Sequence, residues 1–137
     1  MAKSRKAWTM TSAKSPKSTV PDSVKLELTT KTNDLIETVL KPKHVLPPNP
    51  DESFNYITDI GAKWNRNYFY LIATYACPGP NALAPSFESP FARMEYLDNG
   101  KFALSFMRHT GKWVGIFDAL SVDECLKMIQ DGMWFTP

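Results

Sequence analysis

Three apolar segments with an alternating pattern occupy residues 91 to 117 and are separated by two short polar turns. The segments are FARMEYL, KFALSFMR and KWVGIF, and the turns between them are Asp98-Asn99-Gly100 and His109-Thr110-Gly111. Alternation with a period of two, interrupted by glycine-containing turns, is typical of antiparallel hairpins. This stretch constrains the fold most strongly, because a one-residue slip in strand pairing would move every side chain to the opposite face.

The pairing register follows from the requirement for one continuous apolar face. A three-residue loop in each hairpin, with its glycine in the left-handed conformation after a type I turn, pairs apolar residues with one another. The expected pairs are Tyr96 with Phe102, Met94 with Leu104, Ala92 with Phe106, Phe106 with Val114, and Leu104 with Ile116. A two-residue loop would instead mix Arg93 and Glu95 into that face. The favoured register therefore leaves a second face on which five side chains lie close together: Arg93, Glu95, Ser105, Met107 and Trp113.

Two further strands are predicted upstream of these hairpins. The segments FNYITDIGAKW and YFYLIATYAC are rich in aromatic and β-branched residues and flank the polar turn Asn65-Arg66-Asn67. The loop PGPNALAPSFESP then leads into the first of the three segments described above. Because consecutive strands are most often neighbours in a sheet, the sequence predicts a five-stranded antiparallel meander.

A helix is predicted before the strands. Between Asp34 and Lys41 the apolar residues fall on one helix face, and Pro42 is the expected end of the helix. Residues 24 to 33 alternate like a strand but also suit a helical extension, and we favour one continuous helix. A proline-rich linker follows from residue 41 to residue 53.

A second helix is predicted near the end of the sequence. Ser121-Val122-Asp123-Glu124 is a capping-box sequence, in which the Ser121 hydroxyl and the Glu124 carboxylate each accept a backbone N–H of the other residue. The expected apolar stripe comprises Val122, Cys125, Leu126 and Ile129, and Gly132 is the expected end. The predicted fold class is therefore α+β, with an N-terminal helix, a five-stranded antiparallel meander sheet and a C-terminal capping-box helix.

The charges are unevenly distributed along the 137 residues. Residues 1 to 19 contain five basic residues and no acidic one, whereas the remainder contains 11 basic and 14 acidic residues and carries about −3. We expect residues 1 to 20 to form a disordered basic tail and residues 21 to 137 to form a single domain. Nucleic acid is expected to bind only weakly, and only through residues 1 to 19.

Several function classes lack the motifs that they require. No run approaches the ~20 consecutive apolar residues of a membrane span, and the basic tail lacks the apolar centre of a secretory signal. The two cysteines, Cys77 and Cys125, are therefore expected to be reduced thiols in the cytoplasm. Without metal-binding cysteine or histidine spacings or a glycine-rich phosphate loop, we expect neither a metal nor a cofactor.

The meander brings several polar residues to one edge of the sheet. Cys77, the following loop with Asn81, and the turn Arg108-His109-Thr110 all fall at this edge, where loops on a rigid scaffold often carry function. We favour a structural role for the turn, and the alternative is a ligand or enzymatic site in which His109 acts as a base toward Cys77. No residue is assigned as catalytic. The candidate binding residues are Cys77, Asn81, Arg93, Glu95, Arg108, His109, Thr110 and Trp113.

Four motifs of the chain resemble a bacterial, notably cyanobacterial, domain of unknown function. They are CPGPNA, FARMEYL, FMRHTGKW and LSVDECL, against the family patterns FAR-[LM]-EY, MRHTG-[QK]-W and a final LS-x-[DE]-EC-L helix. The resemblance covers roughly residues 34 to 137 and leaves the basic tail outside. It implies a shared fold and no known activity, so no catalytic residue is carried over.

The leading functional prediction is a non-enzymatic module that binds a protein partner or a second copy of itself through one sheet face. It depends on the aromatic content, the regular second face and the lack of a catalytic constellation. The aromatic residues Trp113, Phe117 and Trp134 either lie under the N-terminal helix or contribute to such a surface. The alternatives are the Cys77/His109 edge site and weak nucleic-acid association through the tail.

Overall fold

The structure is a computed structural model that describes residues 19–47, 54–80 and 82–137. The predicted disordered tail, apart from Thr19 and Val20, lies outside the described residues, as does Asn81. Val20 is only 4% exposed, so the core includes it, one residue before the predicted start of the domain.

The helical elements are α1 (Asp22–Leu35), η2 (Ile36–Leu40), α2 (Lys41–His44), α3 (Val122–Asp131) and η3 (Met133–Phe135). The strands are β1 (Tyr56–Asn65), β2 (Tyr68–Ala76), β3 (Ser86–Asp98), β4 (Lys101–Met107) and β5 (Trp113–Leu120).

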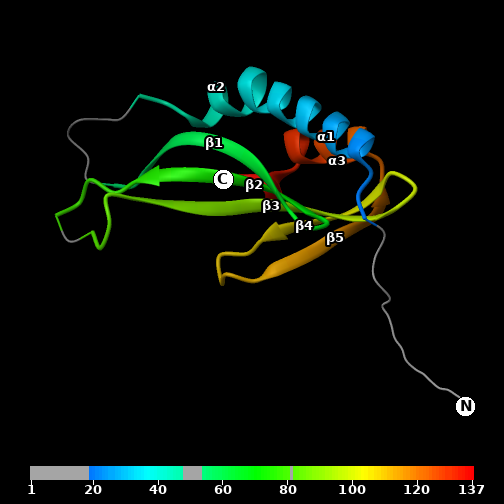
Figure 1. Cartoon of the computed structure of the whole chain (residues 1–137). Helices are drawn as coiled ribbons and strands as arrows, with labels where there is room; N and C mark the ends of the chain where they lie inside the picture. The colour runs from blue at the N-terminus through cyan, green and yellow to red at the C-terminus, as the bar shows by residue number, and fades with distance from the viewer. Residues whose placement is uncertain (1–18, 48–53, 81) are drawn as a thin grey trace, which may run out of the picture.

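The five strands form one antiparallel sheet in the order β1-β2-β3-β4-β5, which confirms the predicted meander. Figure 1 shows α1 and α3 side by side on one face of this sheet. The opposite face, which we call the open face, is covered by no element among the described residues. The fold is therefore the predicted α+β arrangement in two layers.

The N-terminal helix is continuous over residues 22 to 44, and Pro42 does not end it as predicted. Just before the proline, η2 is a π-helical turn, in which the Lys41 N–H donates to Ile36 O, five residues back. Pro42 follows this turn directly, so the wider π hydrogen-bonding pattern lies where the proline has no N–H to donate. Burial of Ile36 and Leu40 against the core holds this segment helical.

The predicted register of the β3–β4 hairpin is confirmed, but its turn is of a different type. The three expected pairs of this hairpin are present: Tyr96 with Phe102, Met94 with Leu104, and Ala92 with Phe106. The turn contains only Asn99 and Gly100, both with positive φ (52° and 72°), and Asp98 pairs with Lys101. This is the type I′ geometry that an Asn-Gly pair favours. A bulge at Leu97 restores the register that the three-residue loop was expected to provide.

The β4–β5 hairpin has the expected three-residue loop and an unexpected bulge. Gly111 has φ of 85°, its N–H donates to Arg108 O (2.9 Å), and the Arg108 N–H donates to Lys112 O (2.9 Å). Phe106 pairs with Val114 as predicted. Leu104, however, pairs with Phe117 rather than with Ile116, because Ile116 is the extra residue of a bulge.

The core lies between the two helices and the covered sheet face. Of the eight residues predicted to share the apolar face, five are buried: Ala92, Met94, Tyr96, Phe102 and Leu104. The stripe of α3 is buried as predicted, with Val122, Cys125, Leu126 and Ile129 facing the sheet side of the helix. Helix α1 contributes Leu28 and Leu35, and its Thr29 hydroxyl accepts the Trp64 indole N–H of β1 at 3.0 Å.

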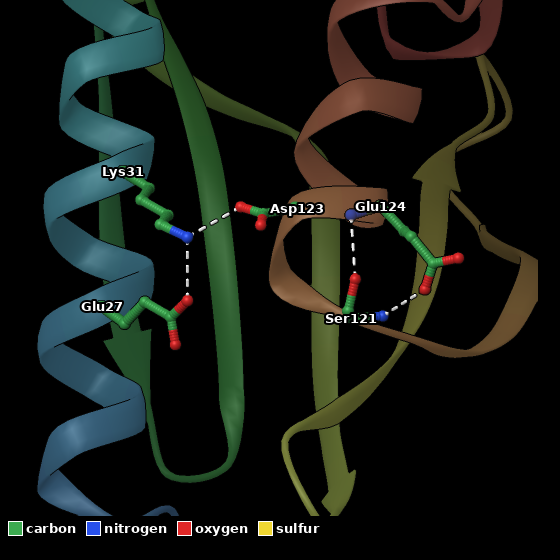
Figure 2. A network of polar contacts seen from close by, with 5 residues as sticks. All are labelled: Glu27, Lys31, Ser121, Asp123 and Glu124. Atoms are coloured by element: carbon green, nitrogen blue, oxygen red, sulfur yellow. Dashed lines mark hydrogen bonds and ion pairs between the residues drawn. The ribbon is translucent and has the colours of Figure 1, made fainter.

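Polar contacts set the start of α3 and join it to α1 (Figure 2). The predicted capping box is present: the Glu124 N–H donates to Ser121 Oγ (3.1 Å), and the Ser121 N–H donates to Glu124 Oε1 (2.8 Å). Lys31 of α1 bridges Glu27 of its own helix (2.9 Å) and Asp123 of α3 (2.8 Å). These side chains are exposed, so the bridge aligns the helices while adding little stability.

Candidate functional site

The open face carries a row of side chains aligned across all five strands. Strand pairing places Lys63 beside Tyr70, Tyr70 beside Arg93, Arg93 beside Ser105, and Ser105 beside Gly115. Adjacent to this row, Glu95 pairs with both Tyr68 and Ala103, and Met107 pairs with Trp113. The five residues expected to share this face are therefore brought together.

Arg93 is held between aromatic rings at the centre of the open face. Its guanidinium carbon lies 4.8 Å from the Trp113 ring centroid and 5.0 Å from that of Tyr68. Tyr70 completes the group, with its ring 5.9 Å from Trp113 and 6.2 Å from Tyr68. Cation–π contacts of this kind fix an arginine without neutralising it. We refer to Tyr68, Tyr70, Arg93 and Trp113 as the arginine stack.

One nitrogen of the stacked arginine is left without a hydrogen-bond partner. Arg93 Nε is buried and makes no hydrogen bond. An unsatisfied buried donor is uncommon in a native fold and calls for a specific explanation. An arginine side chain carries a permanent positive charge, so Arg93 presents a fixed cation at the centre of the stack.

Two members of the stack, Tyr68 and Tyr70, were not identified from the sequence as site residues. Their signal was the spacing of two residues within YFYLIATYAC, which places both on the same face of β2. Sequence alternation alone assigned them to a strand. Only the pairing of β2 with β3, Tyr70 opposite Arg93 and Tyr68 opposite Glu95, shows that they meet the arginine.

A cleft of about 580 Å³ lies at the edge where polar residues were expected to gather. Arg108 and His109 of the β4–β5 turn line it, together with Tyr75 of β2 and Phe91 of β3. Thr136 and Pro137, at the end of the printed sequence, also line it. We refer to this feature as the edge cleft.

Two other described residues predicted at this edge, Cys77 and Thr110, are not among those that line the cleft. Cys77 is half-buried, and its backbone N–H donates to Pro85 O at 2.8 Å, which closes the loop of residues 78 to 84. Thr110 is exposed at the tip of the turn. The edge cleft therefore involves Arg108 and His109 but not the proposed Cys77 nucleophile.

Two smaller hollows lie along β1 and β2 on the open face. They have volumes of about 160 and 250 Å³ and share Lys63, Ile72 and Glu88 among their lining residues. Lys63 and Glu88, together with Asp59 in the smaller hollow, add charges of both signs to the face. The hollows show that the face is uneven rather than flat.

The cysteines differ in environment. Burial raises the pKa of the Cys125 thiol to about 12, so this residue serves as a small core side chain. Both cysteines are free thiols. Within the described ranges, no group of three histidine, cysteine or acidic residues is placed to hold a metal ion.

The remaining aromatic residues singled out from the sequence have different surroundings. Phe117 packs half-buried against the core. Trp134 is 47% exposed, and its ring lies 6.3 Å from that of Phe106 on the helix side. Of these three residues, Trp113 belongs to the open face, where its ring lies beside Tyr70.

The fold and these two sites define a small α+β domain with an open antiparallel sheet face. The chain belongs to a family described as a domain of unknown function, DUF3024, which matches residues 12–136. The match begins upstream of residue 34, where the motif resemblance was expected to start, and includes all of α1 and part of the basic segment. No curated protein and no solved structure matches the chain. In the described part of the chain, no helix combines the length and the apolar character needed to cross a membrane.

Proposed function

We propose that this domain is a non-enzymatic module that associates with a second copy of itself through the open sheet face. The observation that carries the proposal is the arginine stack, with Arg93 held between Tyr68 and Trp113 and its Nε lacking a partner. Aromatic residues and arginine are enriched in the energetically dominant centres of protein interfaces. A permanently charged, stacked guanidinium suits recognition rather than acid–base chemistry.

The dimensions of the open face support a face-to-face dimer. Five strands about 4.8 Å apart, each about nine residues long at ~3.4 Å per residue, make a surface of roughly 24 by 30 Å, or about 700 Å². A standard stable interface takes about 800 Å² from each partner. Two open faces packed together would thus bury an area of the size that a stable dimer needs, as two sheets do in a sandwich.

The charges of the open face also support pairing between identical copies. Two basic and three acidic side chains lie on the same face by strand register: Lys63, Arg93, Asp59, Glu88 and Glu95. The face therefore carries both signs of charge with a small acidic excess, and a second copy rotated by two-fold symmetry can oppose unlike charges. A nucleic acid would gain little from such a surface, since phosphate binding requires an excess of basic residues.

A glycine in the central row provides a clean test of this interface. A Cβ at exposed Gly115 would lie 3.7 Å from Ser105 Oγ, an ordinary contact, and the backbone there is not left-handed. Gly115→Lys therefore adds a long cation on β5, the edge strand at one end of the row that crosses the face, without removing any existing contact. Placing an unpaired charge in the interface should weaken self-association at least about 100-fold.

The experiment is sedimentation or light scattering of the full chain over a concentration series. We expect the unmodified chain to form dimers with a Kd below about 100 µM and Gly115→Lys to be monomeric. Leu83→Lys is the matched control, because Leu83 is a fully exposed apolar residue in the loop before β3 and should leave the dimer intact. A monomeric parent chain, or equal effects of the two lysines, would contradict the proposal.

The cellular setting that we propose is the cytoplasm. Two free thiols, one of them half-buried at Cys77, suit a reducing compartment.

The five basic residues among residues 1 to 19 support a weak electrostatic contact with nucleic acid, separate from the open face. Deleting residues 1 to 19 should abolish any such binding, as measured by anisotropy at low salt, without changing the dimer.

A further inference from the structure

We propose that the edge cleft is a binding site for a small molecule that combines an aromatic ring with a carboxylate. This inference does not rest on self-association, because the cleft lining contains no member of the arginine stack, although two of its residues, Met107 and Pro90, also border the open face. Arg108 makes one part of the lining cationic, and Tyr75 and Phe91 make another part aromatic. Its volume of about 580 Å³ is within the range of about 300 to 1,000 Å³ that is usual for ligand pockets.

The cationic wall is presented by a well-defined turn. Two backbone hydrogen bonds, Gly111 N–H to Arg108 O and Arg108 N–H to Lys112 O, both 2.9 Å long, fix the loop that carries Arg108 and His109. Arg108 supplies a planar fork of donors that matches a carboxylate, and His109 adds a ring N–H beside it. Both side chains are exposed, so they are accessible to an incoming anion.

The apolar part of the cleft wall includes two aromatic rings. Phe91 is 5% exposed, and Tyr75 stacks on Phe87 with ring centroids 5.1 Å apart and an interplanar angle of 8°. Pro90 also lines the cleft. Such a wall accommodates a planar ring by stacking and by removal of apolar area from water. Burial raises the pKa of Tyr75, so its hydroxyl stays protonated and neutral.

The charged side chain of the cleft favours an anion. No aspartate or glutamate side chain is among the described residues that line the cleft, and the exposed guanidinium of Arg108 can pair with a ligand carboxylate as well as with the carboxylate of Pro137, the last printed residue, which also lines the cleft. The domain as a whole is mildly acidic outside the basic tail, so a cationic cleft is a local exception. A neutral aromatic would leave the guanidinium without a partner, and a simple anion would leave the apolar wall in water.

The test uses phenylacetate as the probe and the full chain, followed by amide proton–nitrogen correlation spectra. We expect saturable shifts at Tyr75, Phe91 and Gly111, and at least about tenfold weaker binding for acetate and for phenylacetamide, which lack the ring and the charge respectively. Arg108→Ala should weaken phenylacetate binding by about tenfold. Arg66→Ala is the matched control, because Arg66 lies in the β1–β2 turn at the opposite end of the sheet.

Three outcomes would overturn this inference. They are the absence of saturable phenylacetate binding, equal binding by the Arg108→Ala variant, and shifts confined to the open face around Trp113. Phenylacetamide binding as tightly as phenylacetate would likewise contradict the anion requirement. The monomeric Gly115→Lys variant should retain phenylacetate binding, so failure of the dimer and failure of the edge cleft are separate results.

Discussion

Replacing Gly132 with alanine should destabilise the domain because of a steric clash. Gly132 has φ of −85° and ψ of 134°, which alanine adopts readily, so backbone conformation does not demand glycine here. A Cβ at this position, however, would lie 2.5 Å from the Met128 carbonyl oxygen and 3.2 Å from a ring carbon of buried Phe135. The first of these distances is impossible without movement of the backbone at the end of α3.

The size of the effect follows from the two interactions involved. Moving the chain away from the clash costs about 1–3 kcal/mol, the usual range for overpacking. The Gly132 N–H bond to Met128 O, 2.7 Å long, would be lost or strained, adding about 1 kcal/mol. A total of about 2–4 kcal/mol corresponds to a decrease of about 10 °C in Tm for a domain of this size.

Urea unfolding monitored by tryptophan fluorescence provides the measurement, with Gly61→Ala as the control. Gly61 is exposed in β1, and a Cβ there would meet nothing within 4 Å. That substitution should be neutral or stabilise by about 0.5 kcal/mol, since glycine is unfavourable in a strand. If Gly132→Ala were no more destabilising than Gly61→Ala, the argument from close approach would be refuted.

Three further predictions concern the start of α3 and the thiols. Ser121→Ala should lower the free energy of unfolding by about 1 kcal/mol in the same urea assay, because the Glu124 N–H loses its acceptor. Hydrogen bonds from the Ser121 backbone and hydroxyl lower the pKa of Glu124 below its ordinary value of 4.5. The Glu124 carboxylate therefore stabilises the fold fully above pH 4.5 and progressively less as the pH falls through the depressed pKa. Glu124→Gln should show a shallower decrease of stability with acid in pH-resolved thermal melts. A thiol reagent should modify Cys77 alone in the native protein and both cysteines in denaturant, because Cys125 is fully buried and its pKa is raised to about 12. Rapid modification of both cysteines in the native protein would contradict the burial of Cys125.

Features decided by nearby residues could be predicted from the sequence. The alternation in the last three strands and the glycines of their turns predicted the pairs around Met94 and Phe106 correctly. The capping box at Ser121 was equally clear, because both of its hydrogen bonds join residues three apart. Local spacing, turn chemistry and capping depend on a few neighbouring residues, so they are legible without knowledge of the rest of the chain.

Features decided by packing between distant segments could not be predicted in the same way. Pro42 should have ended the helix by local rules, but burial of Ile36 and Leu40 favours a π turn that carries the helix past it. The bulge at Ile116 has a local signal in the neighbouring Gly115, but strict alternation along KWVGIF does not predict it. At Pro42, tertiary packing overrode local preference, because burying apolar surface outweighs a modest backbone penalty.

The sequence by itself determined the order of the elements and the side of each strand that faces the core. It also determined which types of side chain the open face carries. Only the tertiary structure decided which of those residues meet. Arg93 reaches Tyr68 and Trp113 because β3 lies next to β2 and β4, with β5 one strand beyond. The edge cleft exists because the C-terminal residues return to Tyr75 of β2. Contacts between residues so far apart in the chain depend on the summed packing of the whole domain, which no short segment encodes.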